Sequence, residues 1–78
     1  MEYPKKKVFS FPKSKFEEVH FSVKSWKGKT FGEIRVFHIE DDGSKVGTEK
    51  SIYIPQDKFQ EMKEGMEHLI EASQKEKA

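Results

Sequence analysis

The chain has 78 residues and no cysteine, which predicts one domain and excludes disulfides and thiolate metal sites. Its three histidines lie far apart in the sequence, so we expect neither zinc nor another cofactor. Charged residues make up 37% of the chain, and no apolar run approaches the roughly 18 residues of a membrane span. We therefore expect a soluble cytoplasmic protein without a secretory signal, nucleoid-associated if it is bacterial.

The charge is unevenly distributed, although the net charge is only +1. Residues 1–29 carry eight lysines against three glutamates, whereas residues 30–50 and 51–78 each carry two more acidic than basic residues. This asymmetry predicts a basic face turned towards an anionic partner, and a random surface distribution is the alternative. A chain this short also builds only a small core alone, so we expect a core shared by two subunits in a homodimer.

The chain divides into an arm, a domain and a tail. Residues 1–15 are basic and read as an N-terminal arm, in which Val8–Phe11 is a candidate short edge strand. Residues 16–74 are expected to form the single domain, and residues 75–78 a frayed tail.

Two strands are predicted first within the domain. After Phe16, apolar and polar residues alternate as in a half-buried strand, with apolar positions at Val19, Phe21 and Val23. Lys27–Lys29 then supplies a tight turn. Thr30–Glu40 is the second strand, with Ile34 and Val36 on one face and Phe31, Phe37 and Ile39 on the other. This mixed alternation predicts a strand that is strongly curved, bulged or covered on both faces.

A third strand and a helix complete the predicted fold. Glu40–Gly47 is a turn region, Thr48–Ile54 is a strand, and Pro55 ends it because proline cannot continue a ladder. Gln56–Ser73 has helical periodicity, with an apolar stripe at Phe59, Met62, Met66, Leu69 and Ile70. This stripe is better explained as core or dimer contact than as a groove for a target. The predicted class is α+β, a curved antiparallel sheet followed by one amphipathic helix.

Aromatic and cationic residues gather near the first hairpin. Lys24 and Trp26, the only tryptophan, share the strand face opposite to Val19, Phe21 and Val23, and Lys29 and Arg35 can join them. Rings that stack on bases and cations that follow phosphates suit single-stranded nucleic acid. The alternative is that Trp26 packs against the methylene stems of the lysines, or folds back over the hairpin.

No pattern in the chain indicates an enzyme. There is no nucleophile paired with a base and no phosphate-binding loop. The acidic turn at residues 40–42 lacks calcium-loop spacing and is best explained as a solvated turn. His20 alternates outwards, where contact with a ligand is one alternative, and is expected to be a solvated strand residue.

The segment from about residue 16 to residue 72 resembles the C-terminal domain of the transcriptional positive cofactor 4 (Sub-one) family, in the compact form of its bacterial YdbC-type members. The most specific matching residues are Phe21-Ser22-Val23-Lys24, Trp26, Lys27-Gly28-Lys29 and Ile34-Arg35. An acidic-glycine turn, Lys50, an Ile-x-Ile strand and a closing amphipathic helix follow in the order of the family.

The resemblance implies a strongly curved, four-stranded antiparallel sheet followed by one helix, similar in shape to the Whirly proteins. It implies a homodimer whose helices and sheets form a joint core. It also implies two basic channels for single-stranded DNA or melted duplex, and a role like that of a transcription coactivator, in transcription, replication or repair. Contact with the transcription machinery would be in keeping with this role.

The resemblance also assigns binding positions. Trp26 and His38 take the places of stacking aromatics, and Phe37 is an alternative to His38. The phosphate-neutralising cations of the family fall on Lys27, Lys29, Arg35 and Lys50, and Lys45 lies near enough to compensate in part for Glu49. Strand parity adds Lys24 to this set. The sequence departs from the family at His38, which has a smaller ring than tryptophan, and at Glu49, which replaces a basic residue. These departures keep two alternatives open: a protein-interaction dimer with weak or no DNA binding, and an RNA-binding module.

Overall fold

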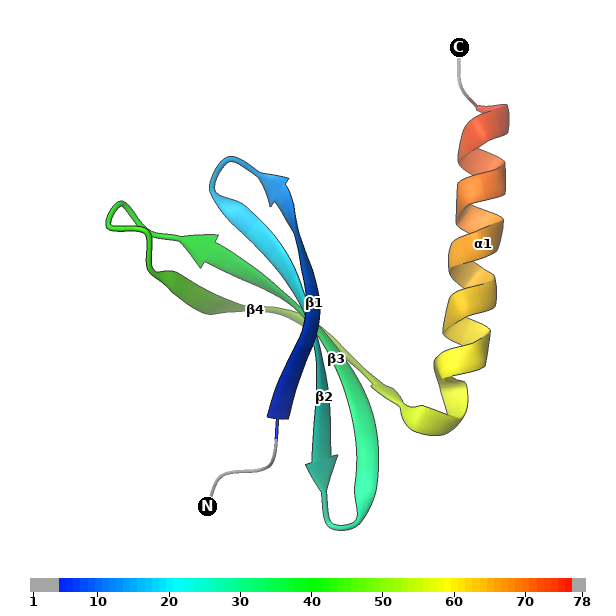
Figure 1. The fold of residues 1–78 in the computed structure, drawn as a ribbon. Helices are drawn as coiled ribbons and strands as arrows, with labels where there is room; N and C mark the ends of the chain where they lie inside the picture. The colour runs from blue at the N-terminus through cyan, green and yellow to red at the C-terminus, as the bar shows by residue number, and fades with distance from the viewer. Residues whose placement is uncertain (1–4, 77–78) are drawn as a thin grey trace.

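The computed structural model describes residues 5–76, which form one sheet followed by a helical segment (Figure 1). The strands are β1 (Lys5–Ser14), β2 (Glu17–Trp26), β3 (Lys29–Ile39) and β4 (Lys45–Pro55), paired antiparallel in chain order. A 3₁₀ turn, η1 (Gln56–Lys58), leads into the helix α1 (Phe59–Lys75). The predicted α+β class, the antiparallel sheet and the closing helix are confirmed.

The first strand is longer than predicted. β1 has 10 residues, where the sequence indicated only a short edge strand inside an arm. Its aromatic side chains explain the difference, because the rings of Phe9 and Phe11 lie 5.8 and 6.0 Å from the ring of Phe21 on β2. Pro12 is tolerated because β1 is an edge strand. Residues 1–4 of the predicted arm and residues 77–78 of the predicted tail lie outside the described residues.

The sheet is twisted but not strongly curled, so the expected strong curvature is wrong (Figure 1). Bulges interrupt the pairing of β1 with β2 and of β3 with β4. In the bulge between β3 and β4, the four residue steps from Gly47 to Ser51 lie opposite the two steps from Arg35 to Phe37. The Thr48 hydroxyl in this bulge donates a hydrogen bond to the Val36 carbonyl at 2.7 Å. The mixed alternation of β3 thus reflects a bulged neighbour and apolar side chains on both faces.

The two faces of the sheet differ in chemistry. We call the side towards α1 the helix face and the opposite side the polar face. The helix face is mainly apolar and carries Phe9, Phe11, Val19, Phe21, Val23, Ile34, Val36, Ile52 and Ile54. The polar face carries Lys5, His20, Lys24, Trp26, Phe31, Glu33, Arg35, Phe37 and Tyr53.

The helix covers little of the helix face. α1 begins under β3, where the Phe59 ring lies so close to Gly32 that a β-carbon there would stand 3.0 Å from it. From this point the helix runs away from the sheet (Figure 1). Among residues 5–76, Ile54 is the one buried hydrophobic residue, and Leu69 near the far end of α1 is 60% exposed. Of the apolar stripe predicted on the helix, Phe59, Met62 and Met66 face the sheet, whereas Leu69 and Ile70 extend beyond it.

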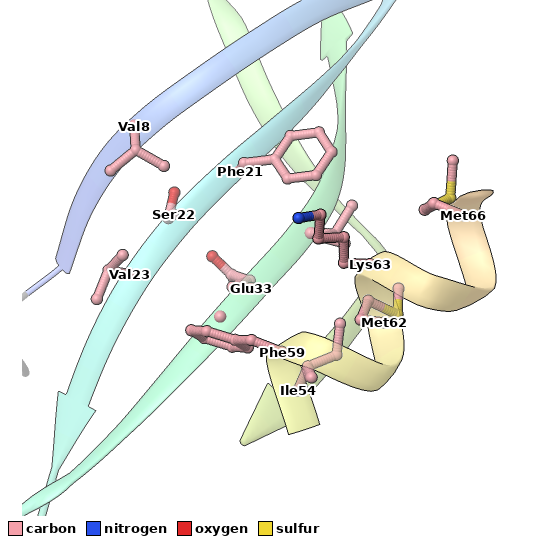
Figure 2. Close-up of a pocket in the computed structure, with 12 residues that line it drawn as sticks. Val8, Phe21, Ser22, Val23, Glu33, Ile54, Phe59, Met62, Lys63 and Met66 are labelled. Atoms are coloured by element: carbon pink, nitrogen blue, oxygen red, sulfur yellow. The ribbon is translucent and has the colours of Figure 1, made fainter. Parts of the chain in front are cut away.

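An open apolar hollow of about 250 Å³ separates α1 from the sheet. Figure 2 shows Phe59, Met62 and Met66 on the helix opposite Phe21 and Ile54 on the strands. Because α1 stands apart from the sheet, the chain is less compact than a typical domain of its length. The radius of gyration is 14.9 Å, against about 11.5 Å for a compact domain of this length. The accessible surface is 6582 Å², against about 4,900 Å² for a compact chain of this mass.

Candidate nucleic-acid interface

The β2–β3 hairpin builds one end of the polar face. Lys27 and Gly28 both have positive φ, 51° and 76°, which is the backbone of a type I′ turn. This turn fixes the register, so that Trp26 pairs with Lys29 and Lys24 pairs with Phe31. Residues in direct register project on the same side of a sheet. The tight turn predicted from the sequence therefore brings aromatic and cationic side chains together.

Trp26 lies at the surface of this hairpin. Its side chain is 40% exposed, and the Lys27 ammonium sits 4.7 Å from the centre of its ring. A cation over the face of an indole ring is a favourable contact. Trp26 is therefore not a core residue, and both Lys24 and Lys29 lie on the same face of the sheet.

An aromatic hollow of about 200 Å³ lies beside Trp26, lined by Lys24, Ser25, Trp26, Phe31 and Tyr53. The Lys24 ammonium stands 5.1 Å from the centre of the Tyr53 ring, so a cation closes one edge of the hollow. The sequence analysis did not assign Phe31 or Tyr53 to the site. Phe31 could have been predicted from the hairpin register, which sets it opposite Lys24. Tyr53 could have been predicted from its alternation with Ile52 and Ile54, which places it on the face opposite to theirs.

A buried carboxylate occupies the centre of the polar face. Glu33 is 2% exposed, and its oxygens lie 3.0 Å from the Lys5 ammonium, 2.7 Å from the Arg35 guanidinium and 3.8 Å from the Lys24 ammonium. Burial alone raises the pKa of this carboxyl. Hydrogen bonds from Lys5, Arg35 and Tyr53 outweigh burial and hold the pKa at about 2. Glu33 is thus charged at neutral pH, and it was missed by the sequence analysis.

Arg35 is half-buried and held by contacts within the protein. Its guanidinium donates to Glu33 through Nε at 3.0 Å and through a terminal nitrogen at 2.7 Å, to the Tyr53 hydroxyl at 2.8 Å, and to the Thr48 carbonyl. These four hydrogen bonds leave little of a group that has five N–H donors. Arg35 lies on the predicted face, but most of its hydrogen-bonding capacity is used within the protein, half of it on Glu33 of the same strand and half on β4.

The far end of the polar face is closed by side-chain contacts. The His20 and Phe37 rings are stacked with centres 4.1 Å apart, and His20 Nε2 lies 3.0 Å from Glu18 Oε1. Lys45 pairs with the same Glu18 oxygen at 3.1 Å. The hydrogen bonds with His20 and then Lys45 lower the pKa of Glu18. His20 is buried, so its predicted place as a solvated strand residue is wrong; it covers one side of the Phe37 ring.

Two predicted positions do not join the others. His38 alternates with Phe37 and so projects from the helix face, where it pairs with Glu40 at 3.3 Å. Lys50 lies in the β4 bulge, next to Ser51, which pairs with Arg35 on the polar face, so Lys50 alternates onto the opposite face. The structure therefore brings together Lys24, Trp26, Lys29, Arg35, Phe37 and Lys45 on the polar face, places Lys27 at its hairpin tip, and separates His38 and Lys50 from it.

Comparison of the chain with protein-family models, with curated protein sequences and with solved structures found no match. Within residues 5–76, no helix is long and apolar enough to cross a membrane. The same residues contain no group of three or more His, Asp and Glu side chains that could bind a metal ion.

Proposed function

We propose that the protein binds single-stranded DNA, with little sequence preference, on the polar face of its sheet. The observation that carries the proposal is the exposed Trp26 ring, which borders an aromatic hollow and is surrounded by Lys24, Lys27 and Lys29. Unpaired bases stack on such rings, and lysines neutralise the phosphates that join them. The arrangement favours single strands over duplex, in which the bases are already stacked on one another.

The proposed active species is a homodimer. The apolar helix face and the stripe on α1 are left exposed in one subunit, which is the surface that a second subunit would cover. The surface in excess of that of a compact chain is about 1,600 Å² for this mass. That excess exceeds the roughly 800 Å² per partner of a standard interface and matches obligate dimers. The polar face remains free in such a dimer, so association and nucleic-acid binding would use opposite sides of the sheet.

The binding sites would act in a process that exposes single strands, such as transcription, replication or repair, in the manner of a transcription coactivator. This part of the proposal is supported by the sequence resemblance alone. Binding itself requires no catalytic step and no cofactor, because stacking and charge neutralisation supply the affinity.

Titration with a labelled oligothymidylate tests the proposal directly. We expect binding to quench Trp26 fluorescence and to weaken as salt rises, with a slope of about −0.7 per phosphate neutralised. Single-stranded RNA of the same length and the matching duplex serve as competitors, and the duplex should compete least. Binding of RNA alone would replace the DNA assignment by an RNA-binding module. No quenching and no salt response with any of the three would instead support the protein-interaction dimer.

A further inference from the structure

The hollow beside Trp26 is lined mainly by aromatic side chains. Three of its five lining residues are aromatic, and they come from β2, β3 and β4. Its volume of about 200 Å³ lies below the range of roughly 300–1,000 Å³ that accommodates drug-sized ligands. The hollow thus suits one flat ring system and not an extended molecule.

The walls are held in place before any ligand arrives. The Tyr53 hydroxyl accepts a hydrogen bond from Arg35 at 2.8 Å, and Arg35 is bound in turn by the buried Glu33 at 2.7 Å. Phe31 is fixed by the register between Lys24 and Pro55 on the neighbouring strands. A site whose side chains are already ordered loses less entropy when it binds.

Charge surrounds the hollow and is absent from its aromatic walls. Lys24 lies at the rim over Tyr53, and Lys27 lies over Trp26. A second, wider hollow of about 660 Å³ also borders Trp26 and Phe31, and its charged lining residues are Lys29, Lys58 and Asp57, which leaves it with one net positive charge. A ligand with a flat, uncharged ring and an anionic chain attached to it matches this distribution, and a nucleotide within a single strand is such a ligand.

We propose that Trp26, Phe31, Tyr53 and Lys24 form a pocket for one unpaired nucleobase, and that Arg35 acts as a positioning residue that fixes the Tyr53 wall. This proposal rests on the proposed function and adds to it a defined subsite with two residues, Phe31 and Tyr53, that the sequence pattern did not assign. A base enters this pocket only after it leaves a stack, so the pocket would itself discriminate against duplex.

The test compares ring-removing variants in the oligothymidylate titration. Phe31→Leu and Tyr53→Leu keep an apolar side chain and lose the ring, whereas Tyr53→Phe keeps the ring and loses the hydroxyl. Phe16→Leu, at the opposite end of the sheet in the β1–β2 turn, is the matched control. Stacking on one base is worth roughly 1–3 kcal/mol. The two leucine variants should therefore bind about 5- to 150-fold more weakly, with an unchanged salt slope, because no charge is removed. Tyr53→Phe keeps the ring but loses the hydrogen bond from Arg35 that holds it, so it should bind more weakly than the wild type and more tightly than Tyr53→Leu. Phe16→Leu should bind as tightly as the wild type.

A second measurement leaves the protein unchanged. An oligomer of abasic residues, equal in length and charge to the oligothymidylate, should bind wild-type protein more weakly by a similar factor and should not quench Trp26. This comparison decides the matter if circular dichroism shows that a leucine variant is unfolded.

The outcomes separate the pocket from the function. If the wild type binds oligothymidylate while folded Phe31→Leu and Tyr53→Leu bind equally well, the pocket is overturned and the proposed function stands. Equal affinity for the abasic oligomer has the same meaning. If the wild type binds no single strand at all, the proposed function fails, and the pocket fails with it.

Discussion

The charge of Glu33 is expected to stabilise the fold, and Glu33→Gln isolates that contribution. The carboxyl lies between β1 and β3, where its oxygens contact Lys5 and Arg35 at 3.0 and 2.7 Å. Glutamine has nearly the same shape but carries no charge. The variant should therefore leave the strand pairing intact and remove the electrostatic part of the interaction.

The magnitude follows from the pKa of this carboxyl. It is lowered from an ordinary 4.5 to about 2 in the folded protein, which corresponds to about 3 kcal/mol at 1.36 kcal/mol per pH unit. Because the folded state has the lower pKa, the unfolded state binds the proton more readily. The stabilisation is thus complete above pH 4.5 and is lost as the pH falls towards 2. At pH 7, Glu33→Gln should lower the free energy of unfolding by about 3 kcal/mol.

The assay is urea unfolding followed by circular dichroism between pH 7 and pH 2, at one protein concentration and one ionic strength. The wild-type and Glu33→Gln curves of stability against pH should converge as the solution is acidified. Glu17→Gln is the control, because Glu17 pairs with Lys13 at the surface and should leave most of the pH dependence unchanged. Parallel wild-type and Glu33→Gln curves between pH 5 and pH 2 would refute the assignment of this charge to Glu33.

Three further predictions address the turn, the dimer and the phosphate contacts. Gly28→Ala should destabilise the protein by roughly 1–2 kcal/mol in thermal unfolding, because φ is 76° at this position. Gly65→Ala in the exposed helix should instead stabilise the protein by about 1 kcal/mol. A destabilised Gly65→Ala variant would mean that another backbone approaches α1 at this point. Light scattering should give twice the 9.2 kDa mass of one chain, and Leu69→Glu on the exposed stripe should shift the mass towards that of one chain; a wild-type monomer at micromolar concentration would contradict the dimer. Lys29→Gln should reduce the salt slope of oligothymidylate binding by about 0.7 and leave Trp26 quenching in place, whereas Lys75→Gln at the end of α1 should leave the slope unchanged.

Local patterns were sufficient to predict the elements and their order. Alternation identified β2, the Lys-Gly-Lys turn joined it to β3, and the change to helical period after Pro55 located the helix. These signals act over a few residues, where turn geometry and side-chain period dominate. The length of β1 was underestimated because its pairing depends on aromatic contacts with β2 and not on its own pattern.

Part of the site was also within reach of the sequence. Strand parity placed Lys24 and Trp26 on the face opposite to Val23, and the structure agrees. The same parity separates Arg35 from His38, although the family resemblance assigned both to one site. Alternation along a single strand was here the better guide, because successive side chains of a strand point to opposite faces.

The tertiary structure decided what the charged residues do. By its sequence neighbours, Glu33 is an ordinary polar strand residue, yet the register of three strands surrounds it with Lys5, Arg35 and Tyr53. Those partners lie up to 28 positions away in the chain, and no local pattern reports a contact over such a separation. The sequence by itself determined the strands, the hairpin and the chemistry of each face. Only the packing of the strands determined which cations are committed to Glu33 and which remain at the surface beside Trp26.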